Sequence, residues 1–183
     1  MIILRIDRDW ETQQSIKAYV DNELSGQIVI GTPTATTSGT SVAFASSLPT
    51  GIKRIDVIFN AVSRSGTSPL IIQIGDSGGL ETSSYTSSAA RASASETPAT
   101  SSAGFVVDSG SGGASCSFRG IMTLVNDSGN VWIASGSIGE STGYGYVTGG
   151  SKTLSATLDR LSLTTAGGSD TFDAGSINYI YYT

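Results

Sequence analysis

The motif Gly75-Asp76-Ser77-Gly78-Gly79 is the most obvious place in this 183-residue sequence to look for chemistry. It matches the sequence around the nucleophile of chymotrypsin-like serine proteases. A serine hydroxyl is a weak nucleophile and needs an adjacent base, usually a histidine, to take its proton. The chain contains no histidine, and lysine occurs only at positions 17, 53 and 152. We therefore interpret the motif as a glycine-rich turn after the apolar segment 70–74.

The missing histidines also limit the other kinds of site that one chain could build. They exclude a Ser-His-Asp triad and any histidine-ligated metal centre. The single cysteine, Cys116, allows no internal disulfide or thiolate zinc cluster, and we expect it to be an ordinary small strand residue. A formal net charge of -5 argues against nucleic acid as a partner. We expect no cofactor and no bound metal.

Carboxylates are the remaining groups that could catalyse a reaction. A glycosidase needs two of them facing each other across the scissile bond. Six could meet in the fold or across a subunit interface: Asp76, Glu81, Asp108, Glu140, Asp170 and Asp173. No local spacing favours such a pair, and isolated aspartates usually cap turns. The segment Asp170-Thr-Phe-Asp173 offers oxygen ligands for calcium but lacks the dense acidic pattern of a calcium loop, so a turn is favoured. We expect no enzymatic activity.

Tyrosines provide the candidate ligand contacts. Tyr144 and Tyr146 alternate on one expected strand face, and exposed rings of this kind can stack on sugars. Tyrosine is equally common as packing material with its hydroxyl at the rim, and that alternative stays open. Tyr85 lies in a long Ser/Thr-rich stretch and is the best candidate for an exposed ring. Packing is favoured for Trp132.

The first forty residues differ from the rest of the chain. Residues 8–24 lack glycine and proline, and the apolar residues Ile16, Val20 and Leu24 recur every four positions. This spacing predicts a short amphipathic helix, which is marginal in water without a partner, either its own domain or copies of itself. Residues 31–40 follow as a polar linker. We therefore expect a docking or trimerisation segment over 1–40, with these three residues as its oligomerisation contacts.

From residue 41 onwards the apolar period changes to two, which is typical of strands. In 54–62, for example, Ile55, Val57 and Phe59 share one face. The expected strands cover 41–46, 54–62, 70–75, 104–108, 117–126, 131–138, 144–148, 151–158, 160–165 and 176–182. Residues 126–130 predict a hairpin loop, Gly149-Gly150 predicts a tight turn, and a slip of phase at 159–160 predicts a bulge or corner. Residues 77–103 predict a long loop, part of which could form an edge strand.

These elements predict an all-β protein, a jelly-roll-like antiparallel β-sandwich over residues 41–183. Leu, Ile, Val and Phe supply about 23% of the residues, above the level at which chains fail to form a core. Gly, Ser and Thr supply about two in five residues, which suits turns and outward strand positions. The start of the chain, Met1 to Asp7, has only a few apolar residues before charges arrive, too few for a signal or membrane segment.

Four segments resemble a module common at the C-terminal end of bacteriophage tail-fibre and related virion proteins. They are Ile52 to Ser63, Ile72 to Gly79, Gly149 to Arg160, and the closing stretch from Leu163 to Asn178. The resemblance covers about residues 40–183 and is most specific in the last thirty. It implies a compact β-sandwich on the surface of a phage particle, often trimeric and used to recognise the host. It offers no catalytic motif.

The resemblance favours one function over two alternatives. We expect a trimeric, non-enzymatic virion protein that attaches to a host cell-surface polysaccharide and contacts other phage proteins through its N-terminal segment, without inserting into a membrane. The first alternative is a structural virion subunit, such as a capsid decoration, baseplate or fibre-network protein. The second is a polysaccharide depolymerase or another hydrolase.

Overall fold

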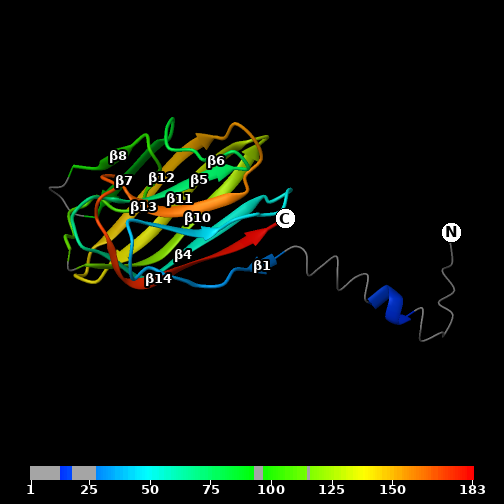
Figure 1. Ribbon diagram of the computed structural model, residues 1–183, viewed down its shortest axis with the longest axis horizontal. Helices are drawn as coiled ribbons and strands as arrows, with labels where there is room; N and C mark the ends of the chain where they lie inside the picture. The colour runs from blue at the N-terminus through cyan, green and yellow to red at the C-terminus, as the bar shows by residue number, and fades with distance from the viewer. Residues whose placement is uncertain (1–12, 18–27, 93–96, 115) are drawn as a thin grey trace.

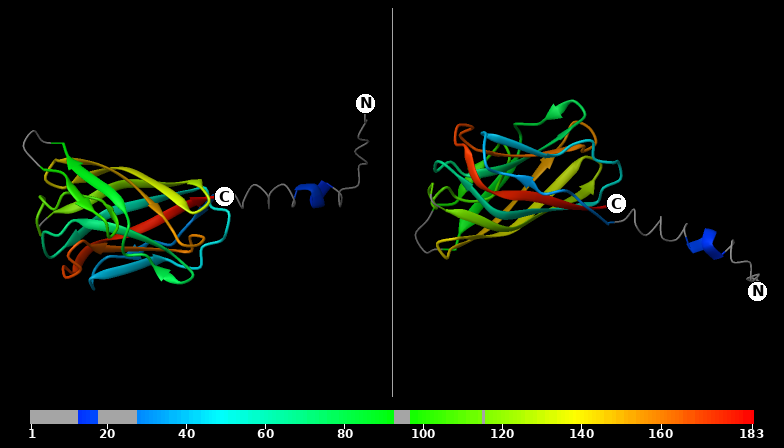
Figure 2. Two further views of the ribbon diagram at one scale, coloured as in Figure 1. Left: turned by 90° about the horizontal axis from the view of Figure 1, so that it is seen from above. Right: turned by 60° about the horizontal axis from the view of Figure 1, so that its bottom comes forward.

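The computed structural model describes residues 13–17, 28–92, 97–114 and 116–183. Most of the described residues belong to two antiparallel sheets packed face to face (Figure 1). Two further views show the two layers and the C-terminus beside β1, at one end of the sandwich (Figure 2). The expected all-β, antiparallel β-sandwich is therefore confirmed, whereas jelly-roll connectivity stays a prediction.

Within the part of the chain that the structure describes, the larger sheet has nine strands, each paired with an antiparallel neighbour. Its order is β1 (Ile28–Ile30), β14 (Phe172–Tyr182), β4 (Arg54–Arg64), β10 (Ser117–Ser128), β11 (Val131–Glu140), β12 (Gly145–Thr153), β7 (Thr86–Arg91) and β8 (Ala99–Ser101), and β2 (Thr34–Ala35) pairs with β14. The predicted hairpin loop at 126–130 is confirmed between β10 and β11.

The smaller sheet covers the inner face of the larger one. Its order is β3 (Ser41–Ala45), β13 (Arg160–Thr165), β5 (Leu70–Asp76) and β6 (Gly79–Leu80), and β9 (Phe105–Val106) pairs with β5. Every residue of β5 is buried because this strand lies in the middle of its sheet and against the larger sheet.

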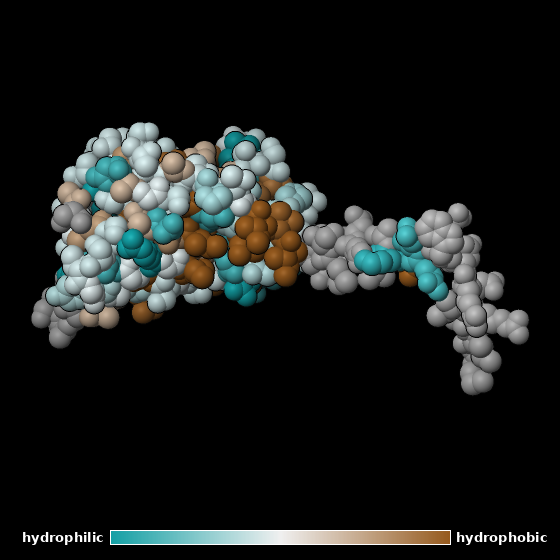
Figure 3. Space-filling model, turned by 90° about the horizontal axis from the view of Figure 1, so that it is seen from below, coloured by the Kyte–Doolittle hydropathy of each residue, from teal (hydrophilic) through white to brown (hydrophobic). Residues whose placement is uncertain are grey.

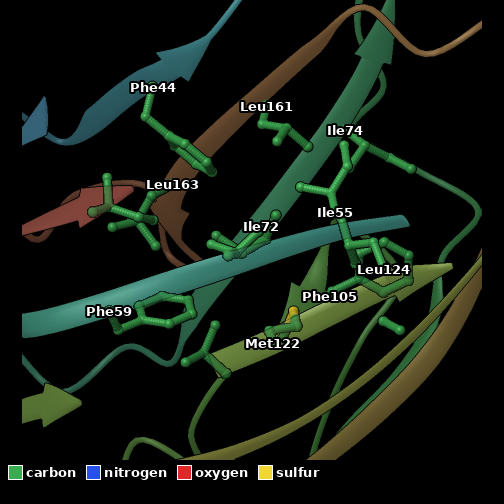
Figure 4. Close-up of a cluster of buried hydrophobic side chains, with 14 of the residues drawn as sticks. Phe44, Ile55, Phe59, Ile72, Ile74, Phe105, Met122, Leu124, Leu161 and Leu163 are labelled. Carbon is green, nitrogen blue, oxygen red and sulfur yellow. The ribbon is translucent and has the colours of Figure 1, made fainter. Parts of the chain in front are cut away.

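The core lies between the sheets and follows the predicted alternation of side chains. Ile55, Val57 and Phe59 of β4 all point inward and are buried. Figure 4 shows inward residues of the larger sheet meeting those of the smaller one, with side chains from β4 and β10 opposite side chains from β5 and β13. The packing role predicted for Trp132 is also confirmed, because its side chain is buried in this core.

The predicted tight turn at Gly149-Gly150 is wrong. Both glycines lie inside β12, paired with β11 on one side and β7 on the other. A Cβ on Gly150 would stand 2.9 Å from Ser87 Cα and closer still to the Thr86 carbonyl oxygen. The glycine thus allows β7 to approach closely, instead of turning the chain.

The predicted slip of phase at 159–160 corresponds to a corner between the sheets. The chain leaves the larger sheet after Thr153 and enters the smaller sheet at Arg160. Leu154 and Leu158 are buried in this connection, so the crossing segment contributes to the core. The expected strand over 151–158 therefore ends early.

Two segments that were expected to be irregular contain strands. Residues 77–103 include β6, β7 and β8, with β8 at an edge of the larger sheet as the edge-strand alternative allowed. Residues 31–40, expected to be a linker, contain β2, and β1 comes directly before them. Among the described residues, the larger sheet therefore already includes two strands upstream of residue 41.

Of the predicted helix over 8–24, residues 13–17 are described and are helical. Ile16 is 53% exposed, whereas Val20 and Leu24 lie outside the described residues. The described residues include no helical segment with both the length and the apolar character needed to span a bilayer.

Candidate functional site

An open groove lies on the larger sheet, over β7, β8 and β12. Its volume is about 720 Å³, within the range common for ligand-binding sites. Its lining consists of one tyrosine, two glycines and six residues with aliphatic hydroxyls, which are Tyr85, Gly149, Gly150, Thr86, Ser87, Ser88, Thr100, Ser101 and Ser102. A lining of this kind offers many hydrogen-bonding groups and no large aliphatic side chain.

Three of the hydroxyls in the lining are used to hold the groove together. The Ser87 hydroxyl accepts from the Val106 amide at 2.8 Å and donates to the Gly149 carbonyl at 3.3 Å. The Ser101 hydroxyl accepts from the Ala103 amide at 3.0 Å. The Tyr85 hydroxyl accepts from the Ile74 amide at 2.9 Å. The bonds to Val106 and Ile74 connect the groove wall to the smaller sheet, because these residues belong to β9 and β5.

Four other hydroxyls face the groove and are exposed. They belong to Thr86, Ser88, Thr100 and Ser102, and none of them bonds to another side chain or backbone group within the described part of the chain. Thr86 and Ser88 alternate on β7 and therefore share a face, and Thr100 lies directly opposite Ser88 in register on β8. Each hydroxyl can both donate and accept a hydrogen bond.

Gly149 keeps the floor of the groove open. It pairs with Ser88 on one side and Ser135 on the other. A Cβ at this position would meet nothing closer than the Ala134 carbonyl oxygen at 3.5 Å, which is ordinary contact. A larger side chain would therefore be tolerated by the fold but would stand in the groove. The groove is therefore open partly because residue 149 is a glycine, which places no side chain over the sheet at this point.

Only one of the three tyrosines predicted as ligand contacts has an exposed ring. Tyr144 is 43% exposed, and the Arg91 guanidinium carbon lies 3.4 Å from its ring centroid. The expectation that Tyr85 is exposed is wrong, because its ring packs edge-on against Phe105 at 5.1 Å. Tyr146 is also buried, and its hydroxyl donates to Glu140. Burial raises the pKa of both buried tyrosines.

An ion pair supports the groove from beneath Tyr85. Lys152 Nζ lies 2.5 Å from Glu81 Oε2, donates to the Ser83 carbonyl at 2.9 Å and sits 5.1 Å from the Tyr85 ring centroid. Burial raises the pKa of Glu81, but bonds from Lys152 and Ser155 outweigh it and hold the pKa below its ordinary value. The charges of Lys152 and Glu81 therefore compensate each other within the protein.

The protease-like motif forms the turn between β5 and β6, as its turn interpretation requires. Asp76 accepts from the Gly78 amide at 2.7 Å and from the Ser155 hydroxyl at 2.6 Å, and these bonds hold its pKa below the ordinary value. Ser77 is exposed, and no base lies against it among the described contacts. Asp76 thus stabilises a turn and fastens it to the corner segment.

The other carboxylates considered in the sequence either hold structural hydrogen bonds and ion pairs or are exposed. Asp108 pairs with Arg64, and Asp170 accepts from the Ser68 amide at 2.9 Å, in keeping with a turn role. Glu140 accepts from Tyr146, Thr142 and Cys116. Asp173 is exposed. Within the described ranges, no three His, Cys, Asp or Glu side chains come together as metal ligands.

Cys116 was expected to be a strand residue, but it is buried in the segment immediately before β10. Its sulfur lies 3.2 Å from Glu140 Oε1. Burial, the hydrogen bond to Glu140 and the charge of that carboxylate raise the thiol pKa. The side chain therefore stays a thiol and acts as a small hydrogen-bonding core residue.

A second surface feature is an aliphatic face on the outside of the larger sheet. Its most exposed members are Ile28, Ile30, Ile121, Val125, Ile133 and Val147. Val125 and Ile133 are direct cross-strand partners. Figure 3 shows apolar side chains gathered near the β1 end of the domain. Exposed apolar surface of this kind is typical of contacts with another protein.

The groove was not found from the sequence, although its residues lie in the serine-rich stretch that was expected to be a loop. The available signal was the alternation at 86–91, where small hydroxyl residues occupy every outward position before Ala90. Comparison of this chain with protein-family models, curated proteins and solved structures finds no match.

Proposed function

We propose that this chain is the non-enzymatic attachment module of a fibre-type bacteriophage virion protein. It works as a homotrimer on the particle surface and holds a host cell-surface polysaccharide in the groove over β7, β8 and β12. The observation that carries the proposal is the set of four exposed, unbonded hydroxyls around that groove. The resemblance of residues 40–183 to phage fibre modules supports the proposed position on a phage particle.

Sugar recognition fits the chemistry of this groove. Sugar hydroxyls act as both donors and acceptors, and the hydroxyls of Thr86, Ser88, Thr100 and Ser102 do the same. Because each such bond replaces a bond to water, its net contribution is only about 0.5–1.5 kcal/mol, so a single groove binds weakly. Three grooves on one trimer would convert weak binding into useful avidity.

The N-terminal segment supports an assembly with other chains. Ile16 is half exposed on the described helical residues and belongs to neither buried core cluster of the described chain. A short apolar helix without a partner is marginal in water. We therefore assign the segment to trimerisation or to docking on other virion proteins.

A single substitution in the groove tests the attachment function. Gly149→Gln places a polar side chain over the groove floor, where the backbone tolerates it. Gly139→Gln is the matched control, because Gly139 is an exposed glycine of the neighbouring strand β11 with equally open surroundings, outside the groove. We expect Gly149→Gln to weaken adsorption to susceptible cells at least tenfold and Gly139→Gln to leave it unchanged. Equal adsorption by both variants would show that the groove does not take part in attachment.

The aliphatic outer face favours a second candidate function, that of a structural virion subunit. Ile121, Val125 and Ile133 would then be covered by another phage protein, since a polysaccharide gains little from such a flat apolar surface. Cryo-electron microscopy of the assembled particle separates the two functions. A position against the capsid or tail sheath supports the second candidate, and a position at a fibre tip supports attachment.

A further inference from the structure

The residues around the groove carry no full charge. Among the nine lining residues only Tyr85 can ionise, and burial raises its pKa further above neutral. The remaining eight are serine, threonine and glycine. A ligand in the groove therefore meets hydroxyl and backbone groups and no charged lining side chain within the described residues.

The two basic residues on the strands under the groove, Lys152 of β12 and Arg91 of β7, are both occupied. Lys152 is only 4% exposed and is held by Glu81 and the Ser83 carbonyl. Arg91, at the end of β7, stacks on Tyr144 and lies 3.6 Å from Glu140. Each cation is already paired with a carboxylate, so recruiting either one to a ligand would leave a buried or partly buried anion without its partner.

The nearby acidic residues are occupied in the same way. Glu81 receives Lys152 and the Ser155 amide, the latter at 2.6 Å. Glu140 receives three hydrogen bonds and the charge of Arg91. An ammonium group on a ligand would therefore find no open carboxylate here.

Desolvation decides which ligands such a groove favours. A charged sugar that enters must exchange water for neutral hydroxyls. The hydration free energy that its charged group loses is large when no opposite charge on the protein compensates it. The chain's net charge of -5 adds repulsion towards anionic polymers. A neutral sugar instead exchanges hydroxyl–water bonds for hydroxyl–hydroxyl bonds at little cost.

We infer that the groove over β7, β8 and β12 selects neutral polysaccharide and discriminates against polymers that carry carboxylate, phosphate or ammonium groups. This inference rests on the proposed attachment function and names the chemical class of its ligand. Because the contacts are uncharged, binding is nearly independent of ionic strength, unlike the binding of an acidic polymer to a basic surface.

The experiment uses the full chain and the surface polysaccharide of cells to which it adsorbs. That polysaccharide is separated by anion exchange into a neutral and an acidic fraction, and each is titrated by calorimetry at about 0.05 M and about 0.5 M salt. The expected result is binding of the neutral fraction, with less than a twofold change in Kd between the two salt concentrations. Gly149→Gln should weaken this binding at least tenfold, and Gly139→Gln should retain it.

Three outcomes would contradict the inference in distinguishable ways. Binding of the acidic fraction alone, weakened severalfold by salt, overturns the selectivity but leaves attachment through polysaccharide standing. Binding of the neutral fraction that survives Gly149→Gln places the ligand outside the groove. Adsorption to cells without binding of either fraction overturns the polysaccharide-binding function itself, and with it the inferred ligand class.

Discussion

Arg64 and Asp108 form a fully buried pair in which the guanidinium and the carboxylate share two hydrogen bonds. Nη2 lies 2.7 Å from Oδ2 and Nη1 lies 3.2 Å from Oδ1, and neither side chain is exposed. Asp108 also accepts from the amides of Leu70 and Gly110, at 2.7 and 2.8 Å. Arg64 ends β4 in the larger sheet and Leu70 begins β5 in the smaller one, so the pair connects the two layers.

Removing the acid of this pair should be strongly destabilising. Asp108→Ala leaves the Arg64 charge buried without a partner and removes the acceptor of two backbone amides. We expect the free energy of unfolding to fall by about 3–5 kcal/mol, measured by urea denaturation. Asp127→Ala, at an exposed position near the end of β10, is the control and should change stability by at most about 0.5 kcal/mol.

The charge and the packing can be separated with a double variant. Arg64→Met combined with Asp108→Leu removes both charges together and should cost less than Asp108→Ala alone. A loss below about 1 kcal/mol for Asp108→Ala would show that the pair contributes little to stability.

A second buried carboxylate should make stability depend on pH. Burial raises the pKa of Glu140, but hydrogen bonds from Thr142, Tyr146 and Cys116 outweigh it and hold the pKa below its ordinary value. The folded state therefore binds fewer protons here than the unfolded state. The resulting stabilisation is present above the unfolded pKa of about 4.3 and is lost as pH falls through the folded pKa.

The prediction concerns the difference between the protein and Glu140→Gln. The unfolding free energies of the two should differ more at pH 7 than at pH 3, because the carboxylate contributes only while it is ionised. Tyr146→Phe removes one of the donors and should reduce the same pH-dependent part. A difference that stays constant from pH 7 to pH 3 would assign Glu140 a purely steric role.

Two adjacent glycines should respond differently to the same substitution. Gly150→Ala puts a methyl group 2.9 Å from Ser87 Cα, so β7 must move, and we expect a loss of about 1–3 kcal/mol in thermal unfolding. Gly149→Ala meets only ordinary contacts and should leave stability unchanged or raise it by up to about 1 kcal/mol. Equal losses would mean that β7 does not approach β12 as closely as described.

These glycines also show where sequence reasoning stopped. The alternation of Ile55, Val57 and Phe59 predicted a strand correctly because a half-buried strand imposes its period on the residues themselves. A Gly-Gly pair indicates a turn only when the glycines are not needed for another reason, such as the close approach of a neighbouring strand. Here the requirement came from β7, which lies more than sixty residues earlier in the chain and which no local pattern could indicate.

The groove was hidden for a related reason. Ser87 and Ser88 are adjacent and chemically identical, yet Ser87 is bonded to Val106 and Gly149 while Ser88 faces the groove. Tyr85 was expected to be exposed because its neighbours in sequence are polar, but Ile74 and Phe105 bury it. Which hydroxyl or ring remains available to a ligand is decided by tertiary neighbours.

The oligomeric state provides the last prediction. Three N-terminal helices packed along Ile16, Val20 and Leu24 would bury these side chains, each contributing about 1.5–3 kcal/mol when fully buried. We expect light scattering on the full chain to give about three times 18.7 kDa. Ile16→Asp combined with Leu24→Asp places charges in that contact and should give the mass of one chain.

The control for this prediction adds a charge away from the contact. Gln14→Asp lies on the same helical stretch, outside the apolar spacing, and should leave the trimer intact. A single-chain mass for the unmodified protein would remove the trimer and with it the avidity on which weak groove binding depends. A trimer that persists after both Ile16→Asp and Leu24→Asp would instead move the interface to the sandwich, where the aliphatic face over β1, β10, β11 and β12 is a surface that could form it.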